Sequence, residues 1–361
     1  MKKLIAILLA LTLCLTLLAG CGGEPAPSSS TEPGSSDGSS SGPAGSGEPL
    51  RVGVLVDGKL GDNAANDDTY SGVQQFADET GAELTTIEVS EIQDHEINAR
   101  NFAEEGYPLV LVCGAQPSEL IAQVAEEYPE THFIILEGTV EDMPNVTCLR
   151  SRPNEAAFLT GAFNALMNKE LGGDLKAAFV GGMRNPNLER SQYGFSAGCE
   201  YVGGECNVVY VGNFTDVAKA KEITLQLYND GLKIVQAFAG GAGMGVYQAA
   251  EGQGEGYWAL GAASGQFDLS DSILASQVKY GGVMMYNACM KYMEGTLEGG
   301  SIEVGLEDGS VGIKYNPLNE DKVPQEIKDQ IAELEEKLLS GELTAPATED
   351  EYNEFANTYL K

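Results

Sequence analysis

Two glycine-rich motifs in this chain are of kinds that carry chemistry in other proteins. Gly194–Gly198 reads GFSAG and matches the GxSxG pattern of serine hydrolases, whose serine occupies a sharp turn between a strand and a helix. Phe238–Gly245 reads FAGGAGMG and follows an apolar run, but its glycines lack the spacing of the dinucleotide-binding fingerprint. We therefore interpret the second motif as a loop whose backbone N–H groups face something polar at a helix N-terminus.

The surroundings of the GxSxG pentapeptide argue against a hydrolase. It lies inside LERSQYGFSAGCEYV (188–202), which we predict to be one helix that begins before the serine. Both histidines, His95 and His132, precede the serine, whereas the hydrolase pattern needs a later histidine. The small residues are better explained by close packing of this helix against another.

The remaining polar clusters give no catalytic constellation. Asp62, Asp67 and Asp68 form a loose group, but the calcium-loop pattern is not satisfied, and helix capping explains these carboxylates about as well as ligand contact. Neither histidine has a partner at metal-ligand spacing, no CxxC or HExxH motif occurs, and no GxxxxGK is followed by the Ser or Thr that a phosphate-binding loop needs. We predict that the protein is not an enzyme and has no metal and no cofactor.

Short apolar runs alternate with stretches of helical length, which is typical of parallel sheets with helical crossovers. One series of predicted strands covers 50–56, 108–114 and 132–138, and a second covers 176–182, 206–212, 233–241 and 257–263. The chain is thus predicted to form two doubly wound α/β lobes, with ligands outside the carboxyl ends of the strands. The amphipathic stretch 324–343 is predicted to be a helix that packs against a lobe.

Composition excludes one class of partner. The 361 residues include 21 Lys and Arg against 54 Asp and Glu, for a net charge of −33. So acidic a protein repels phosphate backbones, and we therefore expect no nucleic-acid partner. Hydrophobic residues make up 43%, enough to form two globular lobes.

The N-terminus indicates export. Lys2 and Lys3 precede an apolar run over 4–19, and Leu18–Cys21 (LAGC) resembles the bacterial lipobox. We predict a lipoprotein signal peptide over 1–20, lipidation of Cys21 and a Gly/Ser/Pro-rich tether over 21–49. The alternatives are an ordinary signal peptide or an uncleaved anchor. The expected location is the extracytoplasmic face of the cell membrane, through a lipid anchor.

Five cysteines remain beyond the leader and the lipobox. Cys199 and Cys206 are close enough in sequence to form a disulfide outside the membrane, but buried free thiols are an equal alternative.

Several blocks together resemble the basic membrane protein (BMP) family, the purine nucleoside receptor A-like substrate-binding lipoproteins of ABC importers. They include LRVGVLVDGKLGDNAANDDTYSG, FLTGAFNALM, AAFVGGMRNP, YVGNFTDVAKAKEITLQLYNDG and FAGGAGMGVYQAA, in this order over residues 50–315. The resemblance implies a type I periplasmic-binding-protein fold, in which two parallel-sheet lobes joined by a hinge close on a ligand in the interlobe cleft. It also implies an ABC permease and an ATPase as partners, and we expect a monomer.

The expected domain boundaries follow from the same resemblance. Lobe 1 is expected over 50–152 with a return segment at about 277–303. Lobe 2 is expected over 153–276 with a return segment at about 304–345, and 346–361 form a C-terminal segment.

The resemblance also implies which residues bind the ligand, and where this chain departs from its relatives. The positions that hold the two base-stacking aromatics and the ribose-binding aspartate in relatives align with Ala65, Ser191 and Ala263. The candidate ligand-binding residues are Asp62, Asn66, Asp67, Glu137, Gly240, Gly241, Gly243 and Lys279. Aromatic residues that are able to compensate for the missing stacking are Tyr70, Tyr193, Phe238, Phe267 and Tyr280.

The sequence thus predicts a solute-binding lipoprotein of an ABC importer. Its ligand is expected to be a small polar or heteroaromatic molecule, nucleoside-like without being confined to purine nucleosides. The alternative is a ligand-sensing surface receptor that is not coupled to transport.

Overall fold

The computed structural model describes residues 48–61, 65–263 and 265–360. The signal peptide, Cys21, nearly all of the tether and Asp62 therefore lie outside the described residues. Within the described ranges, none of the helices has both the length and the apolar character needed to cross a bilayer.

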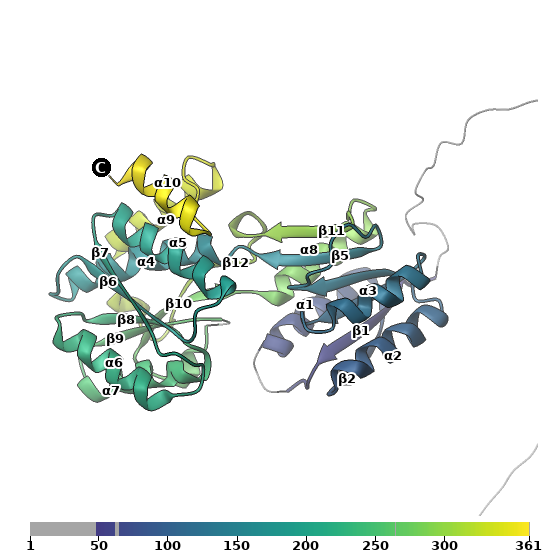
Figure 1. Cartoon of the computed structure of the whole chain (residues 1–361), viewed down its shortest axis with the longest axis horizontal. Helices are drawn as coiled ribbons and strands as arrows, with labels where there is room; N and C mark the ends of the chain where they lie inside the picture. Colours follow the sequence, from purple (N-terminus) through teal and green to yellow (C-terminus); the bar gives the residue numbers. More distant parts are fainter. Residues whose placement is uncertain (1–47, 62–64, 264, 361) are drawn as a thin grey trace, which may run out of the picture. The chain divides into compact units, whose positions relative to one another are not determined.

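Two six-stranded sheets form the centres of two α/β lobes (Figure 1). The sheet of lobe 1, in spatial order, contains β11 (Gly300–Val304), β5 (Val146–Ser151), β4 (His132–Leu136), β3 (Leu109–Cys113), β1 (Arg51–Asp57) and β2 (Glu83–Val89). The sheet of lobe 2 contains β12 (Val311–Tyr315), β10 (Ile273–Lys279), β9 (Trp258–Gly261), β8 (Ile234–Phe238), β6 (Lys176–Gly181) and β7 (Glu205–Tyr210). The predicted pair of doubly wound lobes is confirmed.

One strand departs from the expected parallel arrangement. All pairings are parallel except that of β12 with β10, in which Val311 pairs with Lys279. The chain enters β12 from lobe 1, at the edge of the second sheet where β10 ends. It must therefore run away from that edge, antiparallel to its neighbour.

Helices cover both faces of the lobe 1 sheet because its central strands are apolar on both sides. Val52, Val54 and Val56 of β1 pack with one layer of helices, whereas Leu55 packs with the other. The first layer comprises α1 (Ala65–Thr80) and α8 (Gly281–Met293). The second comprises α2 (Ile92–Glu104) and α3 (Ser118–Glu127).

Lobe 2 repeats this layering with more helices. One face carries α4 (Pro153–Glu170), α5 (Pro186–Tyr201), α9 (Gln325–Leu339) and α10 (Glu349–Tyr359), and the other carries α6 (Val217–Asn229) and α7 (Met244–Gln253). The packing predicted for 324–343 is confirmed, since Ile327, Ile331 and Leu334 of α9 are buried in the lobe 2 core. The last helix, α10, was not predicted; it buries Phe355 in the same core.

The chain passes between the lobes three times, after β5, β10 and β11. The first and third passages are bonded to each other: the Arg152 N–H donates to the Val304 carbonyl (2.9 Å), and the Leu306 N–H donates to the Glu155 carboxylate (2.8 Å). Because β10 remains in the second sheet through Lys279, the middle passage begins later than the expected boundary of about 277. These three passages form the connection between the lobes.

Three glycines bring α4 and α5 into backbone contact. A Cβ on Gly194 would lie 2.2 Å from the Asn154 carbonyl oxygen, and one on Gly198 would lie 1.9 Å from that of Phe158. From the other helix, a Cβ on Gly161 would lie 2.0 Å from the Phe195 carbonyl oxygen. The GFSAG motif therefore lies inside a helix and serves close helix packing, as its context predicted.

This close approach predicts a large cost for one methyl group. Gly198→Ala should lower the melting temperature by about 2–12 °C, because overpacking costs about 1–3 kcal/mol and each kcal/mol lowers the midpoint by about 2–4 °C in a domain of about 150–250 residues. Gly252→Ala is the matched control, since Gly252 lies exposed in α7 with no atom near its added Cβ. That variant should melt at the parental temperature or slightly above it. Equal melting temperatures for the two variants, measured by calorimetry, would contradict this packing.

Candidate functional site

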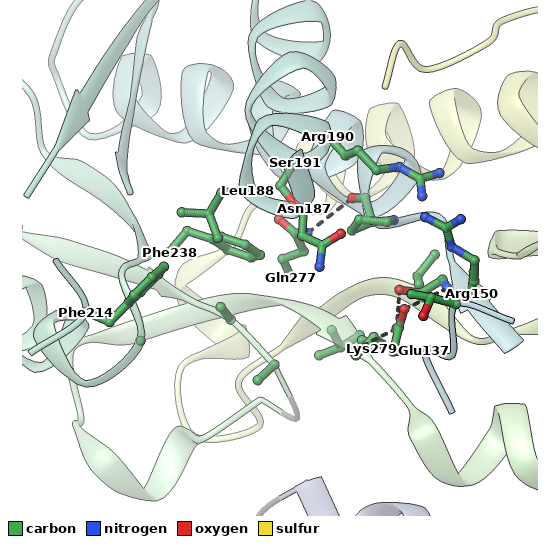
Figure 2. A pocket seen from close by; sticks show the side chains of 18 residues that line it. Glu137, Arg150, Asn187, Leu188, Arg190, Ser191, Phe214, Phe238, Gln277 and Lys279 are labelled. Atoms are coloured by element: carbon green, nitrogen blue, oxygen red, sulfur yellow. Dashed lines mark hydrogen bonds and ion pairs between the residues drawn. The ribbon is translucent and has the colours of Figure 1, made fainter. Parts of the chain in front are cut away.

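A pocket of about 440 Å³ is lined by residues of both lobes (Figure 2). Lobe 1 and the first passage contribute Glu137, Thr139, Arg150, Ser151 and Pro153. Lobe 2 contributes Asn187, Leu188, Arg190, Ser191, Phe214, Phe238, Gly240, Ala262, Ala263, Gln277, Val278, Lys279 and Val311. This volume falls in the range of pockets for small organic ligands.

The carboxyl ends of parallel strands place most of these side chains. Ser151, Phe238 and Lys279 are the last residues of β5, β8 and β10, and Glu137 directly follows β4. Parallel strands have all their carboxyl ends at one edge of a sheet, so both sheets deliver side chains to the pocket. The pocket therefore lies outside the carboxyl ends of the strands, where we predicted that ligands bind.

A carboxylate and an ammonium group meet across the two lobes. The Lys279 Nζ donates to Glu137 Oε1 at 2.9 Å, and the Ser151 hydroxyl donates to the same oxygen at 2.6 Å. Burial raises the pKa of the Glu137 carboxyl, but the charge of Lys279 and the hydrogen bonds from Ser151 and Lys279 outweigh it and hold the pKa below its ordinary value. Glu137 is thus an anion that is ready to accept further hydrogen bonds.

Two pocket residues have the left-handed backbone conformation that non-glycine residues rarely adopt. Glu137 has a φ of 56° and Ala263 a φ of 61°. The backbone oxygen of Ala263 accepts a hydrogen bond from the Lys279 N–H (3.0 Å), which fixes the loop after β9 against β10. Strained residues of this kind concentrate at ligand-binding sites, where the surrounding structure imposes the geometry.

Two phenylalanines form an apolar wall in lobe 2. Phe238 packs against Phe179 with ring centroids 5.6 Å apart, and Phe214 is held by its carbonyl oxygen, which accepts the Ala242 N–H at 2.8 Å. Phe214 packs so closely on Gly182 that a Cβ there would lie 2.3 Å from its ring. Figure 2 shows both rings on the same side of the pocket. This wall offers a flat ligand an aromatic surface.

A buried amide adds a polar group of defined direction. Gln277 is only 4% exposed, and its Nε2 donates to the Pro153 carbonyl (3.2 Å) and to the Ser191 hydroxyl (3.4 Å). Its Oε1 has no hydrogen-bond partner in the described part of the chain. Because a buried acceptor without a partner is costly, this oxygen is suited to bind an N–H or O–H of a ligand.

The structure separates the predicted site residues into two groups. Glu137, Gly240 and Lys279 line the pocket, whereas Gly241 and Gly243 belong to η1 (Gly240–Gly243) without lining it. Asn66 and Asp67 bond to residues at and just after the end of β1, since the Asn66 amide donates to the Asp57 carbonyl (2.9 Å) and Asp67 accepts the Gly61 N–H (2.7 Å). Neither lines the pocket. Asp62 lies outside the described residues.

Two of the positions that the resemblance aligned with ligand-binding residues of relatives fall in the pocket. Ser191 and Ala263, aligned with a stacking ring and a ribose-binding carboxylate, both line it. Of the compensating aromatics, Phe238 lines the pocket, and the others do not.

Sequence reasoning missed Arg150, Arg190, Phe214 and Gln277. The carboxyl-end rule gives a signal for Phe214, which follows β7, and for Arg150, which is the penultimate residue of β5. Arg190 and Gln277 carry no such signal. An arginine in a helix or a glutamine in a strand more often faces solvent or bonds within the protein than contacts a ligand.

No cluster of three His, Cys, Asp or Glu that is suited to a metal occurs among the described residues. In the same part of the chain, Cys113, Cys148, Cys199, Cys206 and Cys289 are free thiols.

A protein-family model and several named relatives match this chain. The family model described as ABC transporter substrate-binding protein PnrA-like (Bmp) matches residues 50–349. Basic membrane protein A of Borreliella afzelii is 27% identical over 86% of this chain and 95% of its own. The ABC transporter nucleoside-binding protein BmpA of Lactococcus lactis is 27% identical over 82% of this chain and 89% of its own.

Solved structures agree on the fold. The ABC transporter solute-binding protein of Aeropyrum pernix superposes with a TM-score of 0.67 at 24% identity, over 86% of this chain and 99% of that one. A solute-binding protein of Conexibacter woesei gives a TM-score of 0.67 at 23% identity, over 82% of this chain and 99% of that one. Both are two-lobed proteins of the periplasmic-binding type, which confirms the expected fold class.

The pair across the lobes gives a prediction for pH dependence. In a double-mutant cycle of Glu137→Gln and Lys279→Met, the coupling at pH 7 should be about 0.5–1 kcal/mol, since both groups are partly exposed. Glu137 has a lowered pKa in the folded state, so this contribution is present above the ordinary glutamate pKa and is lost as pH falls through the lowered value. Urea unfolding should therefore show the coupling shrinking between about pH 5 and 3. A coupling of the same size at both ends of this range would contradict the assignment.

Proposed function

Because the chain belongs to the PnrA-like (Bmp) family of ABC transporter substrate-binding proteins, we propose that it captures a small heteroaromatic solute outside the cytoplasm and delivers it to an ABC importer. The ligand is nucleoside-like in having a flat ring and polar groups, but it need not be a purine nucleoside. The protein does no chemistry on it. The importer's permease and ATPase are the partners.

One observation carries this proposal: the pocket takes its lining from both lobes, at the carboxyl ends of both sheets. A ligand bound there touches both halves at once. It therefore stabilises the conformation in which the halves are closest, which is how a ligand shifts a hinged protein toward closure. The permease would distinguish the closed form from the open one.

The pocket chemistry supports a flat polar ligand. Phe214 and Phe238 supply an apolar surface, while Glu137 and the Gln277 Oε1 supply acceptors for N–H or O–H groups. The resemblance aligns Ser191 and Ala263 with positions that hold a ring and a carboxylate in purine-nucleoside-binding relatives, and both of these residues line the pocket. Stacking on Phe238 in place of a ring and a carboxylate at these positions supports a ligand with a different ring or sugar.

The lipid anchor is a proposal from the sequence. Leu18–Cys21 has the lipobox pattern, and residues 22–49 form a Gly/Ser/Pro-rich spacer between Cys21 and the first strand. Such a tether would keep the binding lobes close to the membrane face on which the permease opens.

Ligand binding should depend on Phe238. We expect Phe238→Ala to weaken binding of the ligand about 5- to 150-fold, since loss of a base–aromatic stack costs about 1–3 kcal/mol. The ligand is identified by mass spectrometry of small molecules that co-purify with the protein, and its affinity is measured by calorimetry alongside inosine, guanosine and adenosine. Phe267→Ala is the control, since Phe267 packs outside the pocket.

Closure of the two lobes on ligand binding is the decisive test of the proposed function. The bound ligand should reduce the radius of gyration in small-angle scattering. If no co-purified molecule or nucleoside either compacts the protein or raises its melting temperature, the proposed function is wrong.

Lipidation is tested separately. In cells labelled with radioactive palmitate, the wild-type chain should carry label and fractionate with membranes, and Cys21→Ala should lose both properties. Membrane retention of unlabelled Cys21→Ala would instead indicate an uncleaved anchor.

A further inference from the structure

One cation in the pocket lacks a counterion. Lys279 pairs with Glu137 at 2.9 Å, and Arg190 pairs with Glu303 at 3.1 Å. Arg150, in β5, has neither a carboxylate partner nor a hydrogen-bond acceptor for its side chain within the described part of the chain. In a protein with a net charge of −33, a half-buried arginine without a carboxylate is unusual, because acids outnumber bases by more than two to one.

Arg150 and Arg190 are both neighbours of Glu303. Strands β5 and β11 are parallel, with Arg150 paired to Glu303, so these two side chains lie on the same face of the sheet. Glu303 is also the carboxylate that Arg190 reaches from α5 in the other lobe. Figure 2 shows both guanidinium groups at the same end of the pocket, opposite the phenylalanine wall.

The positive charges of Arg150 and Arg190 are not fully neutralised by the protein at this end of the pocket. Among the described residues, the ion pair of Glu303 is with Arg190, and its side chain is 49% exposed, so solvent weakens Glu303 as a counterion and Arg150 has no carboxylate of its own. The Arg190 Nε is buried and has no hydrogen-bond partner among the described residues. Planar guanidinium groups offer paired N–H donors that match the oxygens of carboxylates and phosphates.

We propose that Arg150 and Arg190 form an anion subsite that binds a carboxylate or phosphate group of the ligand, whose ring stacks on Phe214 and Phe238. This inference rests on the proposed function, because it takes the pocket to be the ligand site, and it narrows the ligand to an anionic heteroaromatic molecule. The two arginines belong to different lobes, so an anion held between them also favours closure. The subsite supplies affinity in place of the stacking ring and the carboxylate that Ser191 and Ala263 do not provide.

Acidity of the whole molecule makes the subsite selective. The net charge of −33 repels anions at long range, although salt screens this beyond about 8–10 Å. An anion binds favourably only if its charge lies directly against the guanidinium groups, because the short-range attraction there then exceeds the long-range repulsion. We therefore expect recognition of a fixed anionic group on a ring-bearing ligand.

Inorganic anions test the subsite without knowledge of the ligand. At equal ionic strength, phosphate or acetate in place of chloride should raise the melting temperature of the wild-type protein by at least about 2 °C. Arg150→Gln should lose this anion effect. Arg184→Gln is the charge-matched control, since Arg184 is exposed, pairs with Glu189 and lies outside the pocket, and it should behave as the wild type. The phosphate and acetate arms show which anion the subsite prefers.

Paired organic probes test the role of the anion in ligand binding. By calorimetry, a monophosphate or a carboxylate should bind at least about tenfold more tightly than its neutral parent, in the pairs AMP with adenosine, UMP with uridine and orotate with uracil. Arg150→Gln should remove this preference, whereas Arg184→Gln should retain it.

The inference is overturned if phosphate and acetate stabilise Arg150→Gln as much as the wild type, or stabilise neither protein. In that case a neutral nucleoside that still binds and compacts the protein leaves the proposed function standing. If instead the anions act through Arg150 but no organic solute produces closure, the proposed function fails while the anion subsite remains.

Discussion

Parallel strands cannot be joined by tight turns, and this constraint governs the rest of the molecule. A parallel strand must return to the starting edge by a long crossover, through a helix in most cases here and through a loop between β4 and β5, so the carboxyl ends of the parallel strands meet at one edge of each sheet. Both sheets have the same order for their first five strands, β2-β1-β3-β4-β5 in one lobe and β7-β6-β8-β9-β10 in the other. Residues that are distant in sequence, such as Glu137 and Lys279, consequently meet in one pocket.

The pocket combines features that would be unfavourable elsewhere. A left-handed glutamate, a buried amide oxygen without a partner and an arginine without a counterion among the described residues all lie in its lining. The well-packed sheets and the glycine-mediated contact of α4 with α5 provide the stability that tolerates these features. A ligand is able to supply the hydrogen bonds and the charge that these groups lack within the protein. Its donors and its charge should therefore match the unpartnered acceptor and the unpaired arginine.

Much of the fold was predictable from the sequence, because apolar strand runs and helical spacing are local signals. The run 108–114 is apolar enough to be recognised as a buried strand, and its residues Leu109–Cys113 are all buried. The GFSAG helix needed only its flanking residues to be recognised. Antiparallel β12 was not predictable, since its direction depends on the side from which the chain enters the second sheet. Helix α10 was also missed, because its single buried aromatic, Phe355, gives a weak pattern.

The site was predicted less completely than the fold, for a related reason. Glu137 and Lys279 were found because they end apolar strands and because the family resemblance pointed to them. The aromatic wall is formed by Phe214 and Phe238, of which only Phe238 was among the predicted aromatics, because local spacing does not show which rings meet in a pocket. The convergence of Arg150 with Arg190 depends on β11, a strand that lies about 150 residues further along the chain than β5. Only the three-dimensional pairing brings these two charges together.

The three passages between the lobes make each lobe discontinuous in sequence. Lobe 1 takes its first five strands from the N-terminal half but needs α8 and β11 to cover and complete its sheet. No single cut in the gene separates one whole lobe from the other. During synthesis the first lobe therefore stays unfinished until residue 304 has been made, after most of the second lobe has already been synthesised.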